Sequence, residues 1–349
     1  MNYFDKYVSN TLAGTSNQMY FSTNHEVKKG RIYIKPFSYG IYEYSLMFSD
    51  TIDSTYADGS ISVANETCGD WTIHSLKACV KGENSLVETP IYFQGNIEKK
   101  VEKGEIFYTD PVILNVTKEN NLYFEIEFSG GKIPYLEEIN INTYVLNGDE
   151  WALSNRIPLP NMIGIACNVE KKIGFFGDSI TQGLGTEKDS YTHWNAYIAS
   201  KVGEQYSYWN LGIGFGRAAD AASNGAWLNK AKKMDVVTIC YGVNDLGRDY
   251  TNDEIKSNLK RIVEILQSNE TRTILFTIPP FDYDEATTKR WKEINDYILN
   301  ELSQITEVYD VVPIWGMDSP NENRARYGGH PNKEGCLALA NDFIKRIQL

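Results

Sequence analysis

The sequence predicts two parts: an all-β sandwich over residues 1–165 and an α/β domain with a parallel sheet over residues 166–349. In the first part, short aromatic segments alternate with turn signals, and no helix of appreciable length is evident. From about residue 170, short apolar segments alternate with amphipathic ones, as in a parallel sheet covered by helices on both faces. A length of 349 residues fits two domains of ordinary size.

The first part has the sequence pattern of an antiparallel sandwich. Short, roughly alternating strands are expected at residues 31–36, 42–48 and 121–128. Turn signals separate the strands, namely Asp58-Gly59, Lys81-Gly82, Lys103-Gly104 and Ser129-Gly130-Gly131. This spacing favours two packed antiparallel sheets.

The second part alternates strands with helices. Strands are expected at residues 172–176, 206–210, 235–240, 273–278 and 307–312. A helix over Asn252–Ser268 is expected to bury Ile255, Leu259, Ile262, Val263 and Leu266. Another helix should begin near Ala218, and the last should begin near Pro331 and bury Leu337, Ala340, Ile344 and Ile347. In a parallel sheet of this kind, ligands bind beyond the carboxyl ends of the strands.

Charge and cysteine usage exclude several classes of protein. The formal net charge of −12 argues against nucleic acid or an anionic membrane as the main partner. No apolar run reaches the length of a membrane span, and the first residues lack the pattern of a signal peptide. Five widely spaced cysteines without a C-x-x-C pair argue against a disulfide framework or a zinc site. A cytoplasmic protein is therefore expected.

The run Lys172–Gly183, which reads KIGFFGDSITQG, is the most informative segment. It predicts a buried strand that ends in a glycine turn, with Ser179 at the start of a helix. Such a turn exposes the hydroxyl and surrounds it with free backbone N–H groups. A nucleophile for acyl transfer needs this setting, although Gly-Asp-Ser is also ordinary turn chemistry.

A glycine-rich segment, Trp209–Arg217, follows the second strand. Its glycines would let the backbone direct N–H groups at a ligand. A dinucleotide-binding loop is a poor alternative, because the spacing differs from G-x-G-x-x-G and Asp235 precedes its strand instead of following it. A simple tight turn remains open.

Two further elements follow in order. Asn244, directly after the third strand, offers an amide that can donate to an oxyanion, although Asn-Asp is also a common turn. His330 lies in a glycine-rich loop, and the proline that follows disfavours a helical conformation for it, so a position at the mouth of the last helix is expected. That place makes His330 a candidate general base.

The three other histidines are weaker candidates. His25 lies in a polar segment, where solvent exposure is expected, and His74 falls within an alternating strand. His193 precedes Trp194 in a helical stretch and is expected at the surface or on the rim of the site.

Four segments of the chain together resemble the SGNH (GDSL) hydrolase superfamily, and they occur in the family's order. They are Gly177-Asp178-Ser179-Ile180, the 210–216 loop, Gly242-Val243-Asn244-Asp245 and His330-Pro331. The resemblance covers residues from about 170 to 349. It implies a flavodoxin-like three-layer fold, ester hydrolysis through a serine acyl-enzyme, and no metal or organic cofactor. By resemblance, Ser179 is the nucleophile and His330 the base. The Ser179 N–H, a glycine N–H of the second block and the Asn244 amide then form the oxyanion hole.

The sequence departs from the family pattern at two points. The second-block glycine usually lies five residues after the asparagine, where this chain has Phe215; Gly216 is the first choice for its role and Gly214 the second. The aspartate usually three residues before the histidine is replaced by Tyr327.

A phenol with a pKa of about 10 cannot supply the missing negative charge at neutral pH. Either a backbone carbonyl accepts the histidine Nδ1–H, or Asp318 or Glu322 fills in. We favour a Ser-His dyad. Some two-domain SGNH sugar esterases with a preceding β-sandwich look similar in layout and likewise lack this aspartate.

The leading hypothesis is an esterase that removes acetyl or similar short acyl groups from a carbohydrate, so its partner would be a small-molecule or oligosaccharide ester. The abundant aromatic residues, including 23 tyrosines, could stack on sugar rings or simply fill a sandwich core. A lipase or thioesterase for longer acyl chains and a non-catalytic carbohydrate-binding protein are the alternatives. Arg217, Tyr241 and Phe281 are expected on the rim. Sugar binding, shaping of the site and formation of a homo-oligomer all remain open for the first part.

Overall fold

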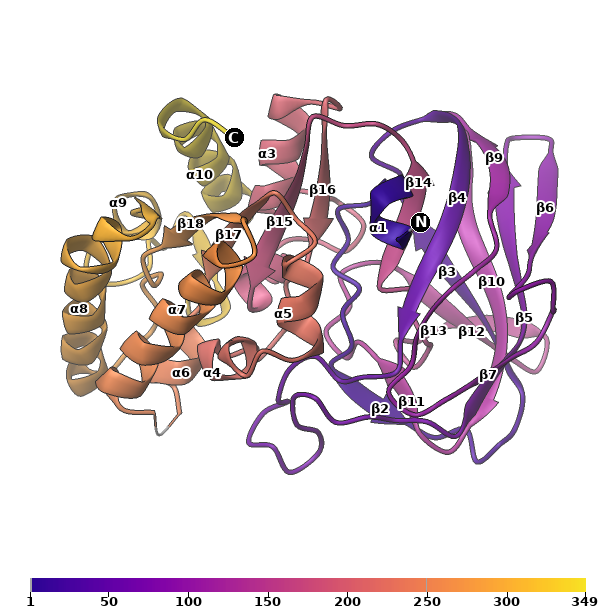
Figure 1. Cartoon of the computed structure of the whole chain (residues 1–349), viewed down its shortest axis with the longest axis horizontal. Coiled ribbons are helices and arrows are strands. Elements are labelled where there is room, and N and C mark those ends of the chain that lie inside the picture. The colour runs from indigo at the N-terminus through magenta and orange to yellow at the C-terminus, as the bar shows by residue number, and fades with distance from the viewer. Residues whose placement is uncertain (1, 249) are drawn as a thin grey trace.

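The computed structural model describes residues 2–248 and 250–349. Figure 1 shows two parts side by side, one made of strands from the first half of the chain and the other of strands wrapped by helices from the second half. The predicted fold class is confirmed for both parts. Among the helices of the described residues, none has the length and apolar character needed to cross a membrane.

Two antiparallel sheets form the first part. The smaller has the order β1-β14-β4-β8, with β9 also paired to β4; its strands are β1 (Tyr7–Ser9), β4 (Gly40–Ser49), β8 (Ile106–Tyr108), β9 (Val112–Val116) and β14 (Met162–Ala166). The larger has the order β13-β12-β3-β10-β5-β6, with β7 also paired to β5; its strands are β3 (Lys28–Ile34), β5 (Trp71–Lys81), β6 (Leu86–Ile91), β7 (Lys99–Val101), β10 (Asn121–Gly130), β12 (Thr143–Asn147) and β13 (Glu150–Leu153).

Aromatic packing joins these two sheets into a sandwich. The ring of Phe107 on β8 lies 6.1 Å from that of Trp71 on β5, measured between centroids, and stacks on Phe48 of β4 at 5.3 Å. A small additional sheet pairs β2 (Met19–Phe21) with β11 (Ile133–Tyr135). The helix α1 (Tyr3–Lys6) has only four residues, so the expectation of strand structure without long helices holds for the described residues here.

A five-stranded parallel sheet forms the centre of the second part. Its strands are β15 (Lys171–Gly177), β16 (Tyr206–Asn210), β17 (Val236–Cys240), β18 (Arg272–Phe276) and β19 (Glu307–Tyr309), in the order β16-β15-β17-β18-β19. This is the flavodoxin-like order 2-1-3-4-5. From β15 the chain first adds β16 on one side and then adds β17 on the other side of β15. The order of the strands therefore reverses between β15 and β17, and sheets of this kind bind ligands at that point.

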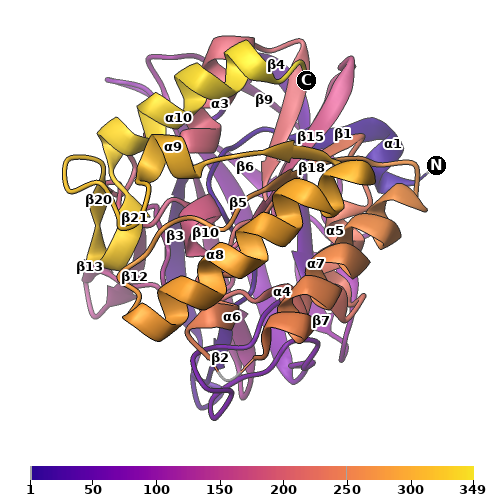
Figure 2. The ribbon, with the colours of Figure 1, turned by 90° about the vertical axis from the view of Figure 1, so that its left-hand side faces the viewer.

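Helices cover both faces of this sheet, and all five residues of β17 are buried. The helix α3 packs against α10, whereas α7 packs against both α4 and α8 (Figure 2). The longer helices are α3 (Trp194–Val202), α7 (Asn252–Gln267), α8 (Glu285–Asn300) and α10 (Lys333–Arg346). The shorter ones are α2 (Ser179–Gln182), α4 (Ala218–Ala222), α5 (Ala226–Ala231), α6 (Val243–Leu246), α9 (Val312–Trp315), η1 (Leu302–Gln304) and η2 (Tyr327–Gly329).

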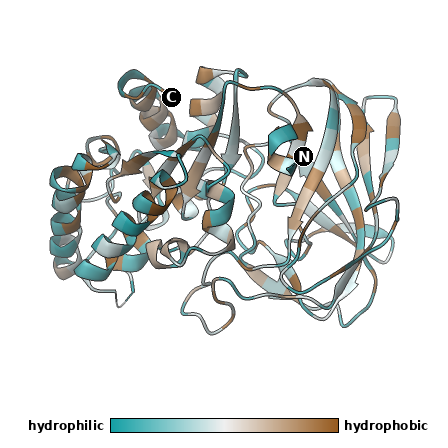
Figure 3. Cartoon of the chain, in the orientation of Figure 1, coloured by the Kyte–Doolittle hydropathy of each residue, from teal (hydrophilic) through white to brown (hydrophobic). Residues whose placement is uncertain are grey.

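The predicted buried face of α7 is confirmed in full, and hydrophilic residues dominate the outer faces of α7 and α8 in Figure 3. The helix α10 begins near Pro331, as predicted, although its first residue is Lys333 and Asn332 caps it. The prediction of its buried face is partly wrong. Leu337 and Ile344 are each 36% exposed, because the helix packs through the neighbouring stripe of Cys336, Leu339, Ala340 and Phe343. The fifth strand also ends early, at Tyr309, since Val312 already begins α9.

Buried polar contacts connect the two parts. Lys230 of α5 forms an ion pair with Asp53 at 2.6 Å, and both side chains are almost fully buried. Trp209 Nε1 of β16 donates to the Asn161 carbonyl at 3.0 Å. Because β14 ends at Ala166 and β15 begins at Lys171, we propose that the two domains meet within residues 167–170, slightly beyond the predicted boundary.

Candidate active site

Ser179 stands at the carboxyl end of β15, where the strand turns directly into α2. Asp178 caps this short helix: its Oδ1 accepts the Ile180 N–H at 2.9 Å. Burial raises the pKa of Asp178 to about 7. The side chain of Ser179 is mostly covered, with an exposed fraction of 7%. Among the described residues no acceptor takes the Ser179 N–H, as expected for the first residue of a helix.

His330 lies within hydrogen-bonding distance of Ser179, although 151 positions separate them in the sequence: the Ser179 Oγ is 2.8 Å from the His330 Nε2. The other ring nitrogen, Nδ1, lies 2.7 Å from the Tyr327 carbonyl oxygen. A carbonyl can only accept, so Nδ1 carries the proton and Nε2 is free to accept from the serine hydroxyl. The carbonyl thus fixes the tautomer that a general base requires.

The loop that carries His330 packs on Phe281. The rings of His330 and Phe281 meet edge to face, with centroids 5.2 Å apart. At Gly329, where φ is +136°, an added Cβ would lie 2.6 Å from the Phe281 ring, so only glycine lets the loop approach so closely. A short pairing of β20 (Ala325–Arg326) with β21 (His330–Pro331) closes the loop. Burial lowers the pKa of His330, and the hydrogen bond to the Tyr327 carbonyl opposes that shift.

The two carboxylates that could replace the missing aspartate, Asp318 and Glu322, lie away from the His330 ring. Asp318 is exposed and pairs with Lys292 at 2.5 Å. Glu322 is also exposed, and neither carboxylate contacts His330. The geometry therefore matches the carbonyl alternative rather than the carboxylate one.

Asp318→Asn and Glu322→Gln are each expected to leave kcat/KM within about twofold of the wild-type value, because exposed carboxylates away from the imidazole stabilise it little. The measurement is steady-state hydrolysis of an aryl acetate across pH 5 to 9. A loss of 100-fold or more in either variant would show that a hidden third member completes the site in solution.

The second and third sequence elements brace each other. The Asn244 Nδ2 donates to the Gly216 carbonyl at 2.9 Å. Asp245 accepts the N–H groups of Ala218 and Ala219 at 2.9 and 3.3 Å, which caps α4, and burial raises its pKa to about 6. Only one Asn244 amide hydrogen is needed for Gly216, so the second remains as a donor.

The N–H of Gly216 is already paired, because it donates to the Ile213 carbonyl at 3.2 Å. This pairing argues against the prediction of Gly216 as an oxyanion donor. The N–H groups of Gly214 and Phe215 have no acceptor among residues 2–248 and 250–349. Phe215 has φ of +61°, a left-handed conformation that glycine adopts far more easily. Phe215 thus occupies a backbone conformation that would suit a glycine.

The sandwich domain holds the second loop in place, which sequence reasoning missed. Gln18 Nε2 donates to the Gly214 carbonyl at 2.9 Å, and its Oε1 accepts the N–H groups of Glu137 and Glu138 at 3.0 and 3.2 Å. The Glu138 carboxylate lies directly against Gly214, where an added Cβ would stand 1.5 Å from Oε2. Burial raises the pKa of Glu138. One sequence feature could have indicated that this segment is buried against another part of the chain: residues 7–24 contain no charged side chain.

Gln18→Ala is expected to lower kcat by about tenfold to 100-fold, because the loop beside Ser179 loses its anchor and small misplacements are costly in catalysis. The variant should also unfold at a lower denaturant concentration, because each buried donor or acceptor left without a hydrogen-bond partner lowers the free energy of unfolding by about 1–3 kcal/mol. Gln205→Ala, at an exposed position, is the matched control. A drop in stability with unchanged kcat and KM would limit Gln18 to a structural role.

Four other residues were predicted on the rim of the site or at the surface, and three of these predictions are wrong. Arg217 and Tyr241 are buried rather than on the rim, with exposed fractions of 7% and 1%. Phe281 is half-buried beside His330, as described above. His193 is 2% exposed at the start of α3, where burial lowers its pKa to about 4, so it is not a surface residue.

Comparison with known proteins assigns this part of the chain to a family. The model of the GDSL-like lipase/acylhydrolase family matches residues 175–337. This part of the chain is a GDSL-like lipase/acylhydrolase domain. The GDSL-type domain contains all four sequence elements and the Ser179–His330 contact, and its family identifies the protein as a carboxylic ester hydrolase.

Several solved structures are similar to this domain. A member of the lipolytic protein G-D-S-L family from Veillonella parvula DSM 2008 is 18% identical, covers 50% of this chain and 97% of its own, with a TM-score of 0.44. A catalytic mutant of an acetylxylan esterase from Geobacillus stearothermophilus is 19% identical, covers 52% of this chain and 96% of its own, with a TM-score of 0.43. No curated protein matches the chain.

Proposed function

We propose that the protein is a serine esterase that hydrolyses short-chain, acetyl-type esters, with carbohydrate as the alcohol part of the substrate. The observation that carries the catalytic part is the chain of contacts from the Ser179 Oγ to the His330 Nε2 and from the His330 Nδ1 to the Tyr327 carbonyl, at 2.8 and 2.7 Å. It is the arrangement of a nucleophile with an oriented base.

In the proposed mechanism, the Ser179 Oγ attacks the ester carbonyl while the His330 Nε2 takes the hydroxyl proton. The carbonyl oxygen becomes an oxyanion. The Ser179 N–H, the free Asn244 amide hydrogen and the Phe215 N–H stabilise that charge in this proposal. His330 then returns its proton to the leaving alcohol as the C–O bond breaks. Water, deprotonated by the same imidazole, hydrolyses the acyl-enzyme and releases the acid.

The choice of Phe215 rests on three observations given above. It stands five residues after Asn210, its φ is +61°, and its N–H has no acceptor among the described residues. Gly214 meets the third criterion only, and its carbonyl is held by Gln18. A backbone N–H can be supplied by any residue except proline, so phenylalanine preserves this donor.

The rate should rise with pH through the titration of His330. The base must be neutral, and burial lowers the pKa of His330 from its ordinary value of 6.5. Protonation of His330, which removes the base, therefore occurs only below pH 6.5. We expect the acidic limb of kcat/KM to have its midpoint below pH 6.5, measured with an aryl acetate whose own hydrolysis is subtracted. A midpoint above pH 7 would indicate a carboxylate partner that stabilises the imidazolium.

The acyl part of the proposal is tested by a series of chromogenic esters from C2 to C10. A maximum of kcat/KM at C2 to C4 supports a short acyl group, and a maximum at C8 or C10 would favour a lipase or thioesterase instead. Incubation with a fluorophosphonate and mass mapping separates both enzymes from a non-catalytic binding protein. The catalytic proposals require an adduct on Ser179, and a binding protein forms none.

A further inference from the structure

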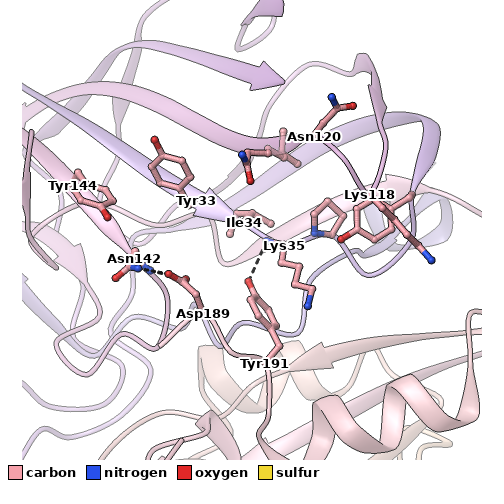
Figure 4. A pocket seen from close by; sticks show the side chains of 13 residues that line it. Tyr33, Ile34, Lys35, Lys118, Asn120, Asn142, Tyr144, Asp189 and Tyr191 are labelled. Carbon is pink, nitrogen blue, oxygen red and sulfur yellow. Dashed lines mark hydrogen bonds between the residues drawn. The ribbon is translucent and has the colours of Figure 1, made fainter. Parts of the chain in front are cut away.

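A cavity of about 380 Å³ lies where the sandwich meets the hydrolase domain, away from the Ser179–His330 pair. Figure 4 shows side chains from both domains converging on it. Its volume falls in the range of about 300–1,000 Å³ that is typical of small-molecule sites. The lining combines four tyrosines, Tyr33, Tyr39, Tyr144 and Tyr191, with the amide and charged side chains of Lys35, Lys118, Asn120, Asn121, Asn142 and Asp189.

The wall that the hydrolase domain contributes is held in a strained conformation. Asp189 and Tyr191 both have positive φ, +58° and +50°, which is uncommon for residues other than glycine. Contacts from the sandwich fix both residues: Asn142 donates to both Asp189 carboxylate oxygens, and the Lys35 N–H donates to the Tyr191 hydroxyl at 3.2 Å. Strain of this kind persists where the surrounding structure imposes it, and it is frequent at ligand-binding sites.

The sandwich supplies a rigid aromatic wall. Tyr33 on β3 stacks on Tyr123 at 5.0 Å between ring centroids and meets Tyr144 on β12 edge to face at 5.6 Å. Tyr33 and Tyr144 are half-buried, so each ring is fixed by its neighbours and still has a surface open to the cavity. Tyrosine combines a flat apolar ring with a hydroxyl, which suits a ligand that is apolar on one face and polar at its edge.

The polar part of the lining is rich in donors. Lys35 and Lys118 are exposed at one side of the cavity, and Asn120 and Asn121 add amide groups. Asp189 already accepts from Asn142 at both oxygens, so its capacity for a ligand is reduced. A ligand with many hydroxyl or carboxylate oxygens would satisfy these donors, whereas a hydrocarbon chain would leave them unpaired.

One lining residue of the cavity, Asp189, lies only a few positions along the chain from a residue that contacts the catalytic site. Gly185 lies against His330, since an added Cβ there would stand 3.1 Å from the His330 Cβ. Asp189 follows four residues later, and four residues span at most about 14 Å. A short oligosaccharide can bridge such a distance.

We propose that this cavity binds one pyranose ring of an oligosaccharide whose acylated residue lies at Ser179. The tyrosine rings stack on the apolar face of the sugar, and the lysine and asparagine groups donate to its oxygens. This inference names a binding site for the carbohydrate part of the substrate, and it rests on the proposed function because the bound sugar would belong to the ester that Ser179 attacks.

The test is isothermal titration calorimetry with the Ser179→Ala protein, which cannot turn over an ester by the proposed route. The probes are xylohexaose and mannohexaose as neutral sugars and hexagalacturonate as an acidic one. At least one should bind, and Tyr144→Ala should weaken it by about threefold to tenfold, the effect of one aromatic contact. Lys118→Ala, at an exposed position, is a second variant that does not endanger folding. Tyr92→Ala, at a half-buried position outside the cavity, is the control.

Binding that is weakened by Tyr144→Ala or Lys118→Ala and unchanged in Tyr92→Ala supports the inference. Selective, salt-dependent binding of hexagalacturonate would identify a carboxylate as the ligand of the lysines. Absence of binding by all three probes, or binding that neither cavity variant alters, overturns it. Wild-type hydrolysis of an aryl acetate is measured in parallel, so failure of the sugar site and failure of the esterase proposal are distinguished.

Discussion

Ser179→Ala is expected to lower aryl acetate hydrolysis by about 10⁴-fold to 10⁶-fold, which in practice abolishes turnover. The hydroxyl is the only group at the His330 Nε2 that can form an acyl-enzyme, at 2.8 Å among the described contacts. Activity left by the oxyanion donors and by binding should be close to the limit of detection. The measurement is steady-state kinetics, with the fluorophosphonate adduct as an independent readout.

Ser200→Ala is the matched control for this substitution. Ser200 lies on the exposed face of α3 in the same domain, where its hydroxyl donates to the Tyr197 carbonyl at 2.9 Å. It should keep full activity and full labelling. Retention of even a tenth of the wild-type rate by Ser179→Ala would remove Ser179 from the mechanism, and labelling at another residue would show where the nucleophile lies.

Asn244→Ala should reduce kcat by about 10²-fold to 10³-fold, the loss measured for a single oxyanion donor. Asn244 also holds the Gly216 carbonyl at 2.9 Å, so the substitution removes a brace as well as a donor. The two roles differ in kinetics: loss of a donor used only in the transition state lowers kcat and leaves KM nearly unchanged. Kinetics and thermal denaturation are therefore measured together.

Asn229→Ala, at an exposed position of α5, serves as the control and should behave as wild type. A loss of less than tenfold in kcat for Asn244→Ala, with a clear drop in melting temperature, would reduce Asn244 to a structural turn residue. The oxyanion hole would then consist of backbone N–H groups alone.

The elements that surround the site could be predicted because strong local patterns determine them. Apolar runs ended by glycine mark β15 and β17, and the wide stripe of Ile255, Leu259 and Ile262 marks α7. The carboxyl ends of parallel strands share one edge of the sheet, so Ser179 and Asn244 were predicted to lie on the same side. The topology places them directly after two adjacent strands: Ser179 begins α2 after β15, and Asn244 lies in α6 after β17.

Long-range packing decides what the sequence could not reveal. Two overlapping apolar stripes run along α10 and share Ala340, and only its packing against α3 and α9 selects the one with Leu339 and Phe343. Whether a carbonyl or a carboxylate faces His330 depends on the conformation of Tyr327, whose φ is +46°. The contact of Gln18 with the Gly214 carbonyl joins residues 196 positions apart, without a local motif.

The strand β16 lies at the edge of the parallel sheet, and the first half of the chain covers it. The ring of Tyr208 meets Phe37 at 5.1 Å, and that of Trp209 stacks on Phe4 at 6.0 Å. A fragment that starts at residue 167 would expose these rings beside the open edge of β16, and an exposed edge strand is a surface on which chains aggregate. The sandwich thus shields an aggregation-prone edge of its neighbour, and we expect soluble expression of the hydrolase half to require both halves in one polypeptide.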